Sequence, residues 1–286
     1  MEPLPLLGGG KHPRIGFGTY KVGFIPASAA SAVSGSEKAG ATENAAEIVG
    51  KALKTGQYKF LDCAQFYGNE REVGDAIKSS GIPRSELFLA SKVWTSTIGE
   101  GGEAVKRQVE KTLESLQTDY LDLYCVHWPV PTMHVEAYHA LCELHAEGKI
   151  RHCGLSNYSI EDYEELMATN PAVPPSVNQI EINPFLYRKK TIEYFRGKGV
   201  VLQSYRSLRD GKEFQNEALL KIASKHGITA AQVLGRWCVQ KDFVVSAPAA
   251  AFVIADCNRW WLSSSNVAAF TIPVAVTLSN LFFTFY

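Results

Sequence analysis

The sequence predicts a single (β/α)8 TIM barrel, and three observations favour this fold. The chain has 286 residues, which suits one α/β barrel of about 250 residues better than two ordinary domains. Short apolar segments alternate with segments of helical periodicity along most of the chain. No G-x-G-x-x-G turn follows the first strand, which disfavours the open sheet that binds dinucleotides.

The predicted barrel begins with an N-terminal β-hairpin and continues through six apolar segments. Segments that are apolar throughout are typical of parallel strands buried on both faces. The helical segments between them end or begin with capping residues, such as Gly56 after one helix and Ser159 before another. The strands are KFLDC, LFLASKVW, DLYCVHW, RHCGLSN, VNQIEIN and VVLQSY, and the helices include ENAAEIVGKALKTG, EAVKRQVEKTLESLQ and IEDYEELMAT.

Two segments do not follow this alternation. Residues 26–42 are small and polar, which indicates a flexible surface insertion inside a barrel domain that spans residues 1–250. Residues 251–286 form an atypical apolar tail with few charges and no clear amphipathic helix.

Three interpretations of this tail compete. An unusual last strand, VAAFTIPVAVTL, is disfavoured by Pro273, because proline is unfavourable in a central strand. A membrane anchor over residues 266–286 is weakened by the same proline and by Ser279 and Asn280. We favour a third interpretation, in which splicing or a frameshift replaced the usual end of the chain. The barrel is then expected to have an incomplete or atypical C-terminal end.

Composition excludes several classes of partner. The chain carries 29 Lys and Arg residues against 29 Asp and Glu residues, so no net field attracts nucleic acid or an anionic membrane. The first residues show neither a signal peptide nor a transit peptide, and we expect a cytoplasmic protein. Six cysteines lack metal-ligand spacing, and we interpret them as reduced thiols with no metal site.

Four polar residues lie at the ends of the first three predicted strands: Asp62, Tyr67, Lys92 and His127. In a barrel these ends meet at one mouth, where the chemistry takes place. The ammonium of Lys92, kept charged by Asp62, would favour the phenolate of Tyr67 and ease proton donation. His127 could orient a carbonyl oxygen. Each residue alone could be an ordinary satisfied structural group, but together they suffice for carbonyl reduction once a hydride donor is present.

Several motifs together resemble the aldo-keto reductase family over about residues 4–245. LDCAQFYGNEREVGDAI is similar to the family's signature around its catalytic Asp and Tyr, ASKVW to its lysine strand, and YLDLYCVHWP to its histidine strand. IGFGTYKVG, GKIRHCGLSNYS and VNQIEINPF follow in family order. The resemblance implies an NADPH-dependent oxidoreductase whose catalytic residues are Asp62, Tyr67, Lys92 and His127.

The resemblance also implies binding roles. The residues that would bind the cofactor NADP(H) surround its nicotinamide, and Tyr205 is the aromatic residue that would stack on the ring. The residues that would bind the substrate line the pocket, where Tyr20 stands in place of the family's usual Trp. The cofactor set is Thr19, Asp62, Ser156, Asn157, Gln179 and Tyr205, and the substrate set is Tyr20, His127 and Trp128.

The sequence departs from the family where the cofactor phosphates would bind. After Tyr205 the family's Ser-Pro-Leu loop is replaced by residues 206–209, Arg-Ser-Leu-Arg, and either arginine could contact a phosphate. Pro248 or Ala249 stands where the family has a lysine for the 2′-phosphate, and the spacing of Asn258 and Arg259 does not match. We therefore expect weakened NADPH affinity.

The leading hypothesis is a monomeric, cytoplasmic reductase of aldehydes or ketones that uses NADPH, with Tyr67 as the proton donor and a small carbonyl compound as substrate. One alternative is a non-catalytic or regulatory relative with impaired cofactor binding. Another is a barrel enzyme in which Lys92 forms a Schiff base, although that chemistry does not require the companion Tyr67.

Overall fold

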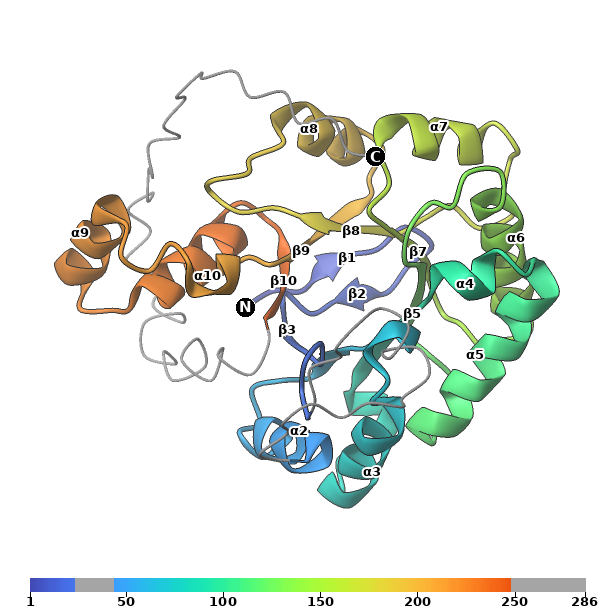
Figure 1. Ribbon diagram of the computed structural model, residues 1–286, viewed down its shortest axis with the longest axis horizontal. Coiled ribbons are helices and arrows are strands. Elements are labelled where there is room, and N and C mark those ends of the chain that lie inside the picture. Colours follow the sequence, from blue (N-terminus) through green and yellow to red (C-terminus); the bar gives the residue numbers. More distant parts are fainter. Residues whose placement is uncertain (24–43, 248–286) are drawn as a thin grey trace.

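The computed structural model describes residues 1–23 and 44–247, and within them eight parallel strands close into a barrel surrounded by helices (Figure 1). The predicted (β/α)8 fold is confirmed. The strand order around the barrel is β10-β3-β4-β5-β6-β7-β8-β9. The strands are β3 (Ile15–Gly18), β4 (Phe60–Asp62), β5 (Phe88–Val93), β6 (Leu123–Val126), β7 (Cys153–Ser156), β8 (Val177–Glu181), β9 (Val201–Tyr205) and β10 (Val244–Ala247).

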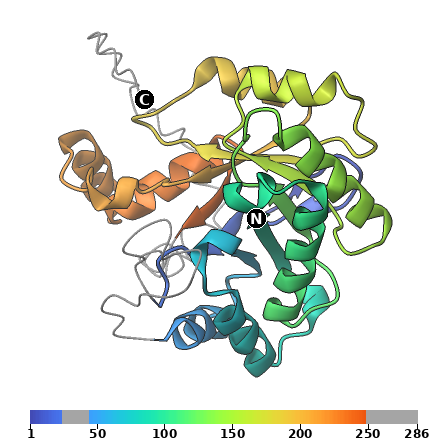
Figure 2. The same cartoon turned by 45° about the vertical axis from the view of Figure 1, so that its right-hand side comes forward.

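Helices on the outside cover the apolar outer faces of the strands, as the turned view also shows (Figure 2). Their ends follow the predicted capping chemistry. Ser159 accepts a hydrogen bond from the Asp162 amide, and the Asp162 side chain bonds the Ser159 amide in return. The helices are α2 (Ala45–Lys54), α3 (Glu70–Ser80), α4 (Thr95–Ile98), α5 (Gly102–Leu116), α6 (His134–Ala146), α7 (Ile160–Met167), α8 (Lys189–Gly197), α9 (Glu217–His226) and α10 (Ala230–Gln240), with 3-10 turns η1 (Gln65–Tyr67), η2 (Arg84–Glu86) and η3 (Arg209–Gly211).

Strand β10 corrects the expectation of an incomplete barrel. It pairs in parallel with β9 on one side and β3 on the other, with Val245 opposite both Ser204 and Ile15. The strand that closes the barrel therefore comes before residues 251–286, the tail in which an unusual last strand was considered. The insertion at residues 26–42 and the tail at residues 251–286, with all three interpretations of it, lie outside the described residues.

The N-terminal hairpin is confirmed as β1 (Leu4–Pro5) paired antiparallel with β2 (Lys11–His12), and it crosses the centre of the ring of strands in Figure 1. His12 is fully buried, and its ring lies 4.7 Å from the ring of Phe60 and 4.3 Å from that of Phe88. Phe60 also leaves no room for a side chain at Gly16, where a Cβ atom would stand 2.0 Å from the Phe60 ring. The hairpin thus packs on apolar side chains inside the barrel.

No helix in the part of the chain that the structure describes is long and apolar enough to cross a membrane. All five cysteines in that part, Cys63, Cys125, Cys142, Cys153 and Cys238, are buried free thiols.

The buried His12 should make folding sensitive to acid. Burial lowers the pKa of His12 from 6.5 to about 4, so the unfolded chain takes up this proton at a higher pH than the folded protein does. The contribution of neutral His12 to the free energy of unfolding is therefore present above pH 6.5, and it is lost as the pH falls towards 4. Between pH 7.5 and 5, this group alone should cost about 2 kcal/mol of unfolding free energy. Urea unfolding at both pH values should show a smaller pH dependence in His12→Leu, and an unchanged dependence would contradict the assignment.

Candidate active site

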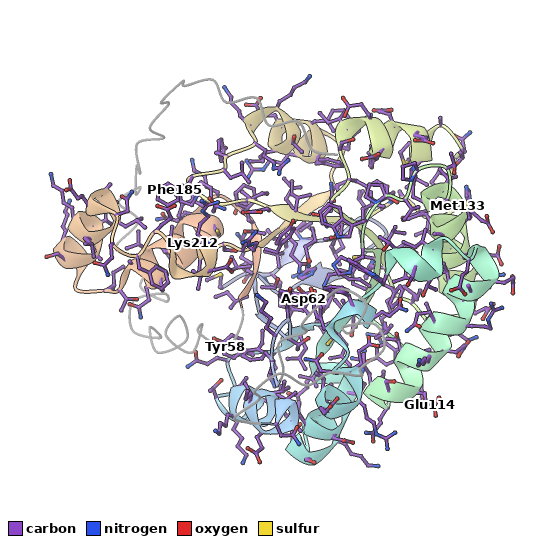
Figure 3. The ribbon with its side chains drawn as sticks, viewed as in Figure 1. Tyr58, Asp62, Glu114, Met133, Phe185 and Lys212 are labelled. Atoms are coloured by element: carbon purple, nitrogen blue, oxygen red, sulfur yellow. The ribbon has the colours of Figure 1, made fainter. Side chains whose placement is uncertain are left out.

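The structure brings Asp62, Tyr67 and Lys92 into direct contact at the carboxyl ends of neighbouring strands. Asp62 is the last residue of β4, at the centre of the ring (Figure 3). Lys92 of β5 is 1% exposed, and its Nζ donates to Asp62 Oδ1 at 2.7 Å, to the Cys63 carbonyl at 2.8 Å and to the Tyr67 hydroxyl oxygen at 3.2 Å. These acceptors engage all three N–H donors of the ammonium. Because the Tyr67 oxygen is an acceptor here, its own hydrogen can point elsewhere.

The electrostatics of this cluster keep Lys92 charged and Tyr67 protonated at neutral pH. Burial favours the neutral lysine, but the Asp62 carboxylate outweighs it, and the pKa of Lys92 is raised above its usual value. Burial raises the pKa of Tyr67 to about 12, although the Lys92 charge acts in the opposite direction. The expected easing of proton loss from Tyr67 by the Lys92 charge is therefore outweighed by burial of the phenol.

His127 follows β6 and is buried next to the cluster. Its ring centre lies 5.0 Å from that of Trp94 and 6.0 Å from that of Tyr67, in both cases edge to face. Burial, and secondarily the charge of Lys92, lowers the pKa of His127 well below its usual value. The imidazole is therefore neutral at pH 7, and its buried Nδ1 has no hydrogen-bond partner among the described residues.

The residues predicted to hold the nicotinamide form one hydrogen-bonded array that reaches Asp62. Ser156 and Gln179 are opposite each other in β7 and β8, and Ser156 Oγ donates to the Gln179 carbonyl. Gln179 Nε2 donates to both Asp62 oxygens at 3.1 and 3.2 Å. Asn157 Nδ2 donates to the His127 carbonyl at 3.0 Å, and its Oδ1 accepts the Tyr205 hydroxyl at 2.8 Å. The array links strands β4, β6, β7, β8 and β9.

Thr19 joins the array from the loop after β3, since both its amide and its hydroxyl donate to the Asp62 carbonyl. The two aromatic residues predicted to face substrate lie at the rim. Tyr20 is 40% exposed with its ring centre 5.1 Å from that of Tyr67, and Trp128, the neighbour of His127 in sequence, is 43% exposed.

Two further aromatic residues beside His127 and Tyr67, Phe66 and Trp94, were not predicted from the sequence. Their rings stack with centres 4.0 Å apart, and Trp94 contacts the ring of His127. Their position in the sequence could have identified them, because they lie in the loops that follow β4 and β5, close to the predicted catalytic residues Tyr67 and Lys92. An aromatic residue in such a loop faces the same mouth as the catalytic candidates.

The two arginines after β9 are already engaged in ion pairs. Arg206 pairs with Asp210 at 2.6 Å and with Glu181 at 3.7 Å, and Arg209 pairs with Glu181 at 3.7 Å. Both arginines adopt left-handed backbone conformations, with φ of 49° and 55°. The other predicted phosphate-side positions, Pro248, Ala249, Asn258 and Arg259, lie outside the described residues.

Comparison with known proteins finds several reductases that are similar to this chain. The chain is similar to a glyoxal reductase of Bacillus subtilis, at 42% identity over 200 residues that cover 70% of this chain and 71% of that protein. It is also similar to the aldehyde reductase YPR1 of Saccharomyces cerevisiae, at 33% identity over 85% of this chain and 81% of the relative. Among solved structures, a mutant of Gox0644 in complex with NADPH superimposes with a TM-score of 0.75 at 29% identity, covering 90% of this chain and 87% of the other.

A family model described as the Aldo/keto reductase family matches residues 14–274. That match extends over most of the chain and includes every residue of the cluster and of the array described above. The protein belongs to the aldo/keto reductase family of oxidoreductases.

Proposed function

We propose that this protein reduces aldehydes or ketones to alcohols with NADPH, and that Tyr67 donates the proton. The observation that carries the proposal is the contact of the protonated Tyr67 hydroxyl with Lys92 Nζ at 3.2 Å, while Asp62 holds that ammonium at 2.7 Å. A protonated phenol beside a fixed positive charge can donate to a developing alkoxide and leave a stabilised phenolate.

The residues at this mouth fit a nicotinamide ring. Gln179 uses its amide N–H groups on Asp62, and its Oε1 makes no hydrogen bond to any described residue, so an acceptor is available for the ring's carboxamide. Tyr205 lies at the end of β9 and is partly buried, which suits stacking against the ring. When bound at these residues, NADPH would supply the hydride for the reduction. Ser156, Asn157 and Gln179 would fix which ring face is presented, with Thr19 and Asp62 beside them.

At the carbonyl, the chain's own groups act on the oxygen. Tyr67 directs its free hydrogen to this atom, and Lys92 stabilises the negative charge that remains on the phenolate. The neutral His127 orients the oxygen by a hydrogen bond, while Tyr20 and Trp128 bound the substrate at the rim. The carbonyl carbon gains a hydride and the oxygen gains a proton, so the product is an alcohol.

The alternative functions are less well supported. A non-catalytic relative does not need the intact contacts of Lys92 with Asp62 and Tyr67. Schiff-base chemistry requires a neutral lysine nitrogen, yet Lys92 has a raised pKa and all its N–H groups are engaged. The names of the relatives make a small dialdehyde such as glyoxal the first substrate to assay.

We also propose a cytoplasmic monomer with one barrel domain over residues 1–250, followed by a tail at 251–286. The free thiols in the described part suit a reducing compartment, and the equal numbers of acidic and basic residues give no reason to expect nucleic acid or membrane partners. Apart from Tyr20 and Trp128, the well-exposed large apolar side chains of the described part are Met1, Phe185 and Leu220, which come from separate segments.

Removing the Tyr67 hydroxyl should abolish most of the activity. In Tyr67→Phe the proton donor is lost while the ring remains, so kcat for glyoxal reduction should fall at least about 100-fold. The dissociation constant for NADPH, followed by nicotinamide fluorescence, should change less than about twofold, because Tyr67 is not part of the nicotinamide array. A variant that keeps its kcat contradicts the role of Tyr67 as proton donor.

Reduction should not depend on pH between 6 and 8. The pKa of His127 is lowered well below 6.5, so this group is already neutral at pH 6, and the pKa of Tyr67 is about 12, so this group stays protonated at pH 8. A profile of kcat/KM at constant ionic strength should therefore be flat over this range. An inflection near 6.5 would show that a histidine changes its charge during turnover, against the neutral role proposed here.

Nucleotide titration tests the cofactor. Purified protein should bind NADPH more tightly than NADH, with a weakened preference because the family's lysine is replaced by Pro248 or Ala249. Fluorescence titration of both nucleotides measures the two affinities. If a folded sample binds neither nucleotide, the reductase function is wrong for this chain.

A further inference from the structure

Tyr67 lies in a short turn, and its ring packs beside those of Tyr20 and His127. The turn η1 has three residues and ends at Gly68, which adopts φ of 65°. Among the described residues, the Tyr67 hydroxyl has one hydrogen-bond partner, Lys92 Nζ. Because this is a single bond, the placement of the hydroxyl also depends on how the residues on either side of Tyr67 are held. Two amide side chains, Gln65 and Asn69, stand two residues before and two residues after it.

Gln65 ties the turn to the loop after β5. Its Oε1 accepts the Trp94 backbone N–H at 2.7 Å, and its Nε2 donates to Thr97 Oγ1 at 2.8 Å. Both polar ends of the amide are thus used, and both partners belong to the same loop and short helix α4. The neighbouring ring contact between Phe66 and Trp94 reinforces the same connection.

Asn69 ties the other side of the turn to the loop after β3. Its Nδ2 donates to the carbonyls of Thr19 and Val22, each at 2.9 Å, and the residue is 1% exposed. The Tyr67 turn is therefore held from two opposite directions. On the Asn69 side the anchor is the loop that carries Tyr20. On the Gln65 side it is the loop that carries Trp94, whose ring contacts His127.

We propose that Gln65 is a positioning residue that holds the Tyr67 hydroxyl at its working distance from Lys92 and His127. The inference rests on the proposed reductase function, and it concerns the proton donor rather than the binding of the nucleotide. Gln65 is better suited to test it than Asn69, because it is only partly buried and its contacts can be removed without emptying the core. Without its two hydrogen bonds, the turn can shift relative to Trp94, and a small misplacement of a reacting group is costly in rate.

The first experiment replaces Gln65 with the similarly shaped Met. In Gln65→Met, kcat for glyoxal reduction should fall about tenfold, while the NADPH dissociation constant should stay within about twofold. The solvent deuterium isotope effect on kcat should rise, because slower proton donation becomes more rate-limiting. A readout independent of turnover is the backbone N–H of Trp94, which should exchange with deuterium about tenfold faster once its acceptor is lost.

Two further variants separate positioning from general damage. Thr97→Val removes one of the two bonds and should lower kcat about threefold, with little additional loss when it is combined with Gln65→Met. Gln108→Met is the matched control, since Gln108 of α5 also donates to a threonine hydroxyl, Thr112 Oγ1, at 3.3 Å, and this bond does not involve the turn Gln65–Tyr67. This control should leave kcat, nucleotide affinity and Trp94 exchange unchanged.

The outcomes distinguish this inference from the proposed function. An unchanged kcat in Gln65→Met, or unchanged Trp94 exchange, overturns the positioning role. So does an equal loss of kcat and NADPH affinity with no change in the isotope effect, because that pattern indicates general structural damage. If the parent protein reduces no carbonyl compound, the proposed function fails. Trp94 exchange then still decides whether Gln65 holds the turn, and the claim about proton donation falls with the function.

Discussion

The buried ion pair of Lys92 and Asp62 is the interaction on which the rest of the site depends. Removing two charges from water costs several kcal/mol per ion, so such a pair is seldom retained for stability alone. Here every donor of the ammonium is engaged, and Asp62 is bound in addition by Gln179 and, through its backbone carbonyl, by Thr19. The pair therefore joins the proton-donating side of the site to the nicotinamide side. Loss of either charge would leave the other buried and uncompensated.

The same pair acts, after burial, on the charge states of the groups around it. His127 is neutral partly because a second positive charge next to Lys92 is unfavourable, after burial has already disfavoured the imidazolium. Tyr67 is held protonated by burial, and the lysine keeps its pKa from rising further. A single cation thus lowers the pKa of both groups: it favours the anionic form of the tyrosine and the neutral form of the histidine.

Much of the fold and of the site could be predicted because the relevant signals are local. Asp62, Lys92 and His127 lie within or directly after strands whose apolar sequence is plain, so their meeting at one mouth follows from barrel geometry. The pKa of Tyr67 could not be predicted, since it depends on how deeply the phenol is buried. Neither could the contacts of Gln65, because its partners are about thirty residues away in another loop.

Strand β10 was missed because only a short apolar segment, FVV, marks it, and its pairing with β3 joins the two ends of the described barrel.

That pairing of β10 with β3 has a consequence for how the protein is made. On a ribosome, β3 emerges early and can pair with β4, but its other edge needs residues 244–247, which are synthesised more than two hundred residues later. Until then the nascent sheet has two unpaired edges, at β3 and at whichever strand was completed last. Open strand edges recruit other chains, and contacts between distant parts of a chain form slowly. The pairing of β10 with β3 and β9, rather than the formation of any single βα unit, is therefore the step that removes both open edges of this sheet.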